Sequence, residues 1–188
     1  MLRIIAGRLK GRRLKIPPAD GVRPTIERVR EAVFNTLTHG LVAEGGAALT
    51  GLQVADVFAG TGAMAFEALS RGAEHVIFLD TDAASLKAID RNADGMGESD
   101  RITVRYGDAT APGVAPWPCN LVFLDAPYRS GLTGAALVAL AEAGWLAHAA
   151  VCVVEIGGTE DLDPPAGFAV LDTRRYRTAK VIYLRFSG

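Results

Sequence analysis

The chain has 188 residues, enough for one hydrophobic core but too few for two catalytic domains of ordinary size. Hydrophobic residues make up 49 % and charged residues 22 %, and the longest apolar run, 145–154, is too short to cross a bilayer, so we expect a cytoplasmic protein without a membrane partner. Cys119 and Cys152 lie in separate apolar runs without a CxxC pair or a histidine cluster, which argues against a metal site and a disulfide framework.

Positive charge is concentrated at the beginning of the chain. Residues 1–30 hold nine Lys or Arg against two acidic residues, whereas the rest holds eleven against nineteen, for a net charge of −1. The runs 3–6 and 13–16 alternate apolar and basic residues and predict a β-hairpin within a basic arm, 1–24. Such an arm favours contact with nucleic-acid phosphates, although a solvated basic face is the alternative. The residues expected to bind RNA are Arg3, Arg8, Lys10, Arg12, Arg13 and Lys15.

A leading helix is predicted within 25–44, with Thr25 as its N-cap. From residue 52, apolar strands alternate with helical segments. The expected strands are 53–58, 75–79, 102–106, 121–124 and 150–156, and the expected helices end at 70 or span 83–96 and 133–143. This order predicts a parallel, doubly wound sheet.

The last two predicted strands, 168–173 and 181–186, have no helix between them and must pair as an antiparallel hairpin. A parallel sheet that ends in such a hairpin is less common among dinucleotide-binding domains than among methyltransferases. We therefore expect one α/β domain over 1–188 with the Rossmann-like fold of S-adenosylmethionine-dependent methyltransferases.

A glycine turn links the first of these strands to its helix in the sequence Asp-Val-Phe-Ala-Gly-Thr-Gly-Ala, 56–63. Gly60 and Gly62, after Phe58, allow a tight turn and leave room for a ligand near the helix N-terminus. Asp80 ends the next strand, where a carboxylate can accept hydrogen bonds from both ribose hydroxyls of an adenosine. Alternatively, the glycines serve only the turn geometry and Asp80 caps a helix.

The glycine turn lacks the third glycine of a dinucleotide-binding motif, since Ala65 or Phe66 stands at that position. S-adenosylmethionine has no pyrophosphate, so the turn suits it better than NAD. After the third strand, Asp108 beside Ala109 is a candidate acceptor for the adenine amine, although Gly-Asp is also an ordinary turn.

The sequence Asp-Ala-Pro-Tyr, 125–128, follows the fourth strand and faces the same switch point of the sheet. A base amine is a poor nucleophile because its lone pair is delocalised into the ring. Hydrogen bonds to the Asp125 carboxylate and to a backbone carbonyl of a turn constrained by Pro127 would aim that lone pair at a methyl group, while Tyr128 stacks on the base. The other interpretation is an ordinary loop with a half-buried Tyr.

Several sequence blocks resemble the bacterial ribosomal RNA small-subunit methyltransferase D family. They are Arg-Ile-Ile-Ala-Gly (3–7), Lys-Gly-Arg (10–12), Arg-Pro-Thr (23–25), Arg-Val-Arg-Glu (28–31), Phe-Asn (34–35), Phe-Ala-Gly-Thr-Gly (58–62) and 125–128. The resemblance implies transfer of a methyl group from S-adenosylmethionine to the N2 amine of a guanine in 16S rRNA during small-subunit assembly. It assigns the target base to Asp125 and Tyr128 and the donor to Gly60, Gly62, Asp80 and Asp108.

One position departs from the family, whose usual motif is Asp-Pro-Pro-Tyr: Ala126 replaces the first proline, which predicts a less rigid turn. Three other functions stay open at this point. They are an adenine-N6 methyltransferase of RNA or DNA, a non-catalytic RNA-binding assembly factor, and an NAD-dependent oxidoreductase. The oxidoreductase is disfavoured because the third glycine and an evident proton donor are missing.

Overall fold

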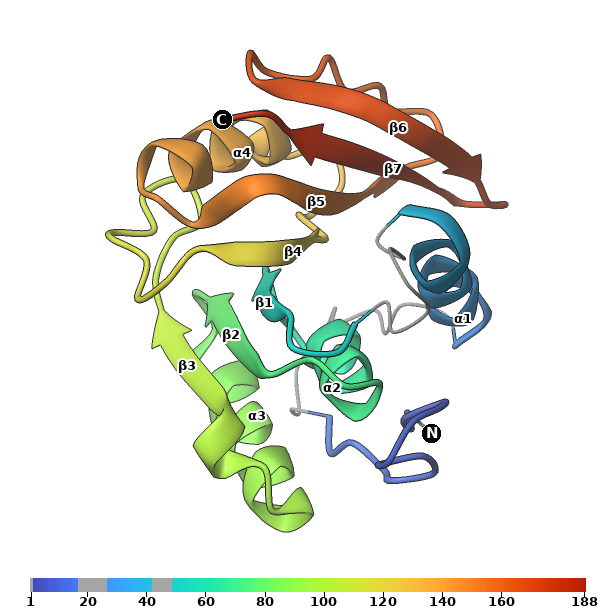
Figure 1. Ribbon diagram of the computed structural model, residues 1–188, viewed down its shortest axis with the longest axis vertical. Coiled ribbons are helices and arrows are strands. Elements are labelled where there is room, and N and C mark those ends of the chain that lie inside the picture. Colours follow the sequence, from blue (N-terminus) through green and yellow to red (C-terminus); the bar gives the residue numbers. More distant parts are fainter. Residues whose placement is uncertain (1, 17–26, 42–48) are drawn as a thin grey trace.

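The computed structural model describes residues 2–16, 27–41 and 49–188 (Figure 1). Its seven-stranded sheet has the order β3-β2-β1-β4-β5-β7-β6. Strands β1 to β5 are parallel, and β7 runs antiparallel to both β5 and β6. The predicted doubly wound sheet with a terminal antiparallel hairpin is therefore confirmed. The strands are β1 (Gln53–Val57), β2 (His75–Asp80), β3 (Ile102–Tyr106), β4 (Cys119–Leu124), β5 (Leu146–Gly157), β6 (Phe168–Arg175) and β7 (Ala179–Phe186).

Within these described residues, four α-helices cover the sheet: α1 (Glu27–Thr36), α2 (Ala63–Ser70), α3 (Ala83–Met96) and α4 (Leu132–Glu142). A π-helical turn, Leu37–Leu41, continues α1, and a 3-10 turn, Ser99–Arg101, precedes β3. The leading helix and the helix over 83–96 are confirmed, whereas the proposed N-cap Thr25 lies outside the described residues. Of the helices described, none is long and apolar enough to cross a membrane.

The hydrophobic core has one layer on each face of the sheet, as continuous apolar strands require. One layer packs α1, α2 and α3 through residues such as Phe34, Phe66 and Ile89. The other packs α4 through Leu137 and contains Trp145, which is fully buried. Both layers leave the carboxyl ends of the parallel strands free for loops.

Strand β5 begins earlier than predicted, at Leu146 instead of residue 150. Its first residues pair irregularly with β4, because the register shifts between Cys119 and Leu121 and Ala149 has a φ of 60°. Residues 146–149 lack the regular pairing on which a strand pattern in the sequence depends. The predicted start of this strand at residue 150 was therefore wrong.

Over residues 2–16, the described part of the N-terminal arm, the chain is hairpin-like with a single β-bridge, between Arg3 and Arg13. It packs against the C-terminal end of α2, where Ser70 accepts hydrogen bonds from Arg8 N at 2.9 Å and, through its hydroxyl, from Leu9 N at 3.0 Å. Gly7 is required here, because its φ is 81° and a Cβ would overlap the Ser70 carbonyl. The arm is thus held on the body of the molecule.

Candidate active site

The glycine turn after β1 and the end of β2 meet at the carboxyl edge of the sheet. Gly60 N donates a 2.7 Å hydrogen bond to Asp80 Oδ2, and Asp82 N donates one of 2.8 Å to Asp80 Oδ1. Gly62 has a φ of 71°, and a Cβ there would lie 2.8 Å from the Phe78 ring. These backbone bonds fix the orientation of the Asp80 carboxylate and leave it further lone pairs for a ligand.

A buried carboxylate on β1, that of Asp56, was not assigned a role from the sequence. Its Oδ2 accepts a 3.1 Å hydrogen bond from Ala65 N in the first turn of α2, where backbone N–H groups lack helical partners. Burial, together with the nearby charges of Asp125 and Asp80, holds the pKa of Asp56 well above its usual range. Asp56 thus anchors the helix that follows the glycine turn, beneath the two predicted site carboxylates.

The predicted turn 125–128 follows β4, next to β1 in the sheet. Ala126 is buried, whereas Pro127 and Tyr128 are exposed. The Tyr128 hydroxyl donates a 2.8 Å hydrogen bond to Glu155 on the neighbouring strand β5. The turn therefore brings the predicted aromatic ring and carboxylate together at the same edge as Gly60.

Asp125 and Glu155 form a pair of carboxyl groups at the ends of β4 and β5. Burial and the charge of Glu155 raise the pKa of Asp125 to about 8. Burial also raises the pKa of Glu155, although the hydrogen bond from Tyr128 opposes this. Glu155 was missed from the sequence because it lies in an otherwise apolar run, and only the pairing of β4 with β5 brings it to Asp125.

An open cavity of about 220 Å³ adjoins this turn. It lies between the turn, the N-terminus of α4 and the loop after β5, and is lined among others by Tyr128, Thr133, Glu160 and Asp163. Glu160 accepts hydrogen bonds from Arg129 N at 2.6 Å and Gly157 N at 2.7 Å, which ties the two loops together. The cavity offers space for a planar group beside the Tyr128 ring.

The other predicted donor residues lie close to the same edge. Phe58 has a φ of 63° and packs against the core layer of α4, to which the buried Ala109 belongs. Asp108 is exposed, and its Oδ1 accepts two 2.8 Å hydrogen bonds from Thr110, which lower the pKa of Asp108. Gly107 N bonds to the Asp80 carbonyl at 3.0 Å, so the end of β3 is adjacent to Asp80. A contact of Asp108 with adenine stays a prediction.

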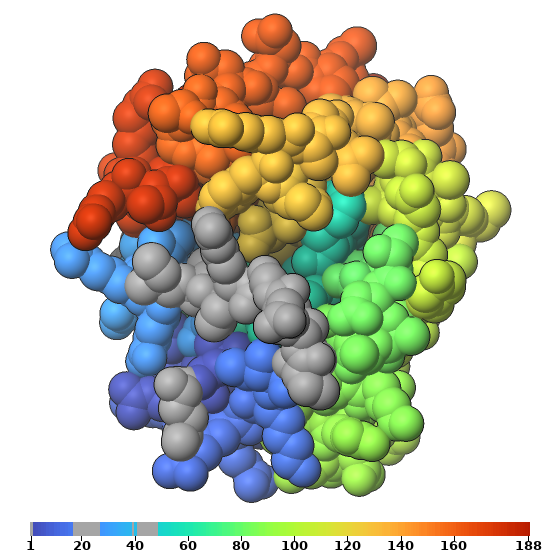
Figure 2. Space-filling model, turned by 180° about the vertical axis from the view of Figure 1, so that it is seen from behind, coloured from blue at the N-terminus to red at the C-terminus, as the bar shows by residue number. Residues whose placement is uncertain are grey.

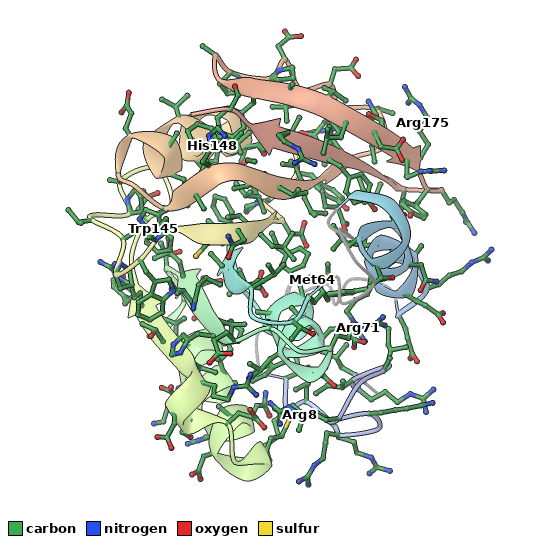
Figure 3. The ribbon with its side chains drawn as sticks, in the orientation of Figure 1. Arg8, Met64, Arg71, Trp145, His148 and Arg175 are labelled. Atoms are coloured by element: carbon green, nitrogen blue, oxygen red, sulfur yellow. The ribbon has the colours of Figure 1, made fainter. Side chains whose placement is uncertain are left out.

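The predicted RNA-binding residues differ in their surroundings. Arg3 pairs with Glu27 at 3.1 Å, and Arg8, labelled in Figure 3, pairs with the buried Glu98. Those two guanidinium groups therefore help to hold the arm in place. The four others are exposed and carry no ion pair within the described part of the chain; they are Lys10, Arg12, Arg13 and Lys15.

Comparison with known proteins places this architecture in a family. The profile of the family described as conserved hypothetical protein 95 matches residues 2–185. The Escherichia coli K12 protein named ribosomal RNA small subunit methyltransferase D is 35 % identical over 154 residues, which cover 82 % of this chain and 74 % of that relative. The chain belongs to the ribosomal RNA small-subunit methyltransferase D family.

Other members of the methyltransferase D family support this placement. The Haemophilus influenzae member is 31 % identical and covers 90 % of this chain and 86 % of its own. The solved Escherichia coli structure titled "Putative methyltransferase yhhF" has a TM-score of 0.84 at 30 % identity, covering 100 % of this chain and 98 % of that one. The fold is thus the Rossmann-like methyltransferase fold predicted from the sequence.

Proposed function

We propose that this chain transfers a methyl group from S-adenosylmethionine to the exocyclic N2 amine of a guanine in 16S rRNA, during assembly of the small ribosomal subunit. The observation that carries the proposal is the adjacency of two turns at one sheet edge. The Gly60 turn follows β1 and the Asp125–Tyr128 turn follows β4, and β1 and β4 are hydrogen-bonded neighbours. A methyl donor bound by the first turn and a base bound by the second would therefore lie next to each other.

The donor seat is proposed to consist of the glycine turn, Asp80 and the loop at Asp108. Asp80 is oriented by two backbone N–H groups and would accept the ribose hydroxyls, which are hydrogen-bond donors. The N-terminus of α2 lies behind the glycine turn, anchored by Asp56. When bound, S-adenosylmethionine supplies an electrophilic methyl group on a sulfonium, so the protein need only position the partner.

The amine clamp is proposed to consist of Asp125, Pro127 and Tyr128. The ring of Tyr128 would stack on the extruded base, and its hydroxyl bond to Glu155 limits rotation of the ring. Asp125 would accept a hydrogen bond from the exocyclic amine and aim the nitrogen lone pair. After transfer, the extra amine proton needs an acceptor, and the Asp125 and Glu155 carboxyl groups at the ends of β4 and β5 are the proposed ones.

The two carboxyl groups favour guanine over adenine. The Watson–Crick edge of guanine presents two neighbouring donors, N1–H and the N2 amine, whereas adenine presents its N6 amine next to an acceptor, N1. The opening of the proposed active site, which we call the mouth, holds the carboxyl groups of Asp125 and Glu155. Together they can accept hydrogen bonds from both guanine donors. When both carboxyl groups are ionised, an adenine N1 would face an oxygen lone pair, which is unfavourable.

Transfer of a labelled methyl group tests the proposal. Small ribosomal subunits lacking the modification are incubated with the protein and tritiated S-adenosylmethionine, and the rRNA is digested to nucleosides. The expected product is N2-methylguanosine in 16S rRNA. Label in N6-methyladenosine would instead support the adenine alternative, and no heat of binding with S-adenosylmethionine in calorimetry would support a non-catalytic assembly factor.

A further inference from the structure

A second group of positive side chains lies outside the N-terminal arm. The end of β6 and the turn that follows it, residues 174–177, carry Arg174, Arg175 and Arg177 around Tyr176, and we call this segment the arginine turn. The three arginines are exposed, and Arg175 extends into solvent in Figure 3. This charge is unusual on a chain that is strongly acidic outside its first 30 residues.

The register of the sheet places the arginine turn at the carboxyl edge of the parallel strands, where the proposed active site lies. Gly157 at the carboxyl end of β5 pairs with Ala179, and Glu155, the partner of Tyr128, pairs with Val181. Arg177 lies four positions before Val181 in the chain, or at most about 13 Å of extended chain. Figure 2 shows this turn (red) on the same face as the segment around 126–134 (gold) and the arm (blue).

The arginine turn is held in place by its own contacts. Tyr176 N donates a 2.8 Å hydrogen bond to Ala179 O, and the half-buried Tyr176 side chain packs against the core layer of α1, α2 and α3. At the base of the turn, the buried Lys180 donates to Asp161 Oδ1 at 2.6 Å and to the carbonyl of Glu160. Glu160 in turn binds Arg129 N beside Tyr128, so the turn is linked to the amine clamp.

We propose that Arg175 and Arg177 bind RNA phosphates next to the target nucleotide, as a second RNA-contacting surface beside the active mouth. This inference rests on the proposed function. A guanidinium group can donate two parallel hydrogen bonds to the oxygens of one phosphate, and it is less strongly hydrated than an ammonium group. The cavity beside Tyr128 is lined by the acidic side chains Glu160, Asp161 and Asp163, whose negative charge repels the RNA backbone. Positive charge close to the mouth would offset that repulsion, whereas Arg174 is already paired with Asp172 at 2.8 Å.

The test compares RNA binding of the double variant Arg175→Ala/Arg177→Ala with the wild type over a range of salt concentrations. Each phosphate contact contributes roughly 0.7–0.9 to the slope of log K against log salt, so the slope should fall by about 1.5. Arg175→Lys/Arg177→Lys keeps the charges and should restore most of the slope. Arg91→Ala is the control, since it removes an exposed arginine from the second half of α3, which runs away from the carboxyl edge.

Two measurements separate the failure of this inference from the failure of the proposed function. Binding of S-adenosylhomocysteine and the thermal unfolding midpoint should be unchanged in the double variant, which excludes a folding defect. If that variant keeps the wild-type slope and affinity while the wild type methylates rRNA, the arginine turn does not bind RNA and the proposed function stands. If the wild type neither binds rRNA nor methylates it, both proposals are wrong.

Discussion

The hydroxyl of Tyr128 donates a 2.8 Å hydrogen bond to the carboxylate of Glu155, which joins the turn after β4 to the neighbouring strand β5. The bond orients the ring proposed to stack on the base. It also keeps Glu155 close to Asp125, whose pKa is raised to about 8 by burial and by the charge of Glu155. The activity of the amine clamp should therefore depend on pH.

Glu155→Gln should shift the pH dependence of methyl transfer. The ionised form of Asp125 accepts from the amine, so kcat/KM of the wild type should rise with pH around 8. Gln keeps an oxygen for the Tyr128 hydroxyl but removes the charge, which lowers the pKa of Asp125. The ratio of kcat/KM at pH 6.5 to that at pH 9 should increase roughly threefold. Glu142→Gln, an exposed change on α4, should leave the profile unaltered, and an unaltered Glu155→Gln profile would count against the clamp.

Asp125→Asn should change how stability depends on pH. The pKa of Asp125 is higher in the folded protein than its ordinary value of 3.8, so the wild type loses stability as pH rises from about 4 towards 8. Asn does not ionise and avoids this loss. The variant should thus gain stability over the wild type between pH 5 and pH 8.5, by on the order of a few kcal/mol. Urea unfolding at pH 5 and at pH 8.5 gives the difference in unfolding free energy between the variant and the wild type. If this difference is the same at both pH values, Asp125 is ionised in the folded protein throughout that range.

Asp80→Ala should weaken binding of S-adenosylmethionine and leave RNA affinity intact. The variant loses the hydrogen bonds that the oriented carboxylate would accept from the two ribose hydroxyls. This loss should cost about 1.5–3 kcal/mol of binding free energy, or roughly 10- to 100-fold in Kd. Calorimetry with S-adenosylhomocysteine measures the change. Asp90→Ala, an exposed change on α3, serves as the control. Equal affinities of the two variants for S-adenosylhomocysteine would show that Asp80 does not bind the donor.

Charge reversal of the arm, as Arg12→Glu/Arg13→Glu, should weaken RNA binding for all sequences alike. Both side chains are exposed, and Glu would repel phosphates that Arg attracts. The slope of log K against log salt should become shallower by about 2, while the affinity for S-adenosylhomocysteine stays within twofold. Retained RNA affinity would show that the arm has a purely structural role.

Glu67→Ala should destabilise the fold because Glu67 joins the arm to two helices. The Glu67 carboxylate is fully buried and accepts from Ile5 N at 2.7 Å, Ala6 N at 3.0 Å and Arg71 Nε at 2.8 Å. It also lies 3.8 Å from the buried guanidinium of Arg30. Removing it takes away the larger of the two negative charges that act on the buried Arg30, the other being Glu27, which costs about 3–5 kcal/mol. A loss below about 1 kcal/mol in urea unfolding would contradict this role.

The sequence predicted the parts of the fold and site that depend on local pattern. The glycine turn, Asp80 and the 125–128 turn each follow an apolar strand, and parallel strands bring such ends to one edge. Glu155 and Glu67 could not be found in this way. Glu155 becomes relevant through the lateral pairing of β4 with β5, and Glu67 looks like a surface residue of α2 until the arm covers it. The burial of Arg30 on α1 depends on the same long-range packing.

A crystal structure with S-adenosylhomocysteine would show whether the turns after β1 and β4 form one site. We expect the ribose hydroxyls within hydrogen-bonding distance of Asp80 and the sulfur atom facing the space between Gly60 and Tyr128. Electron density for the ligand in the cavity between Thr133 and Asp163, away from the glycine turn, would contradict it.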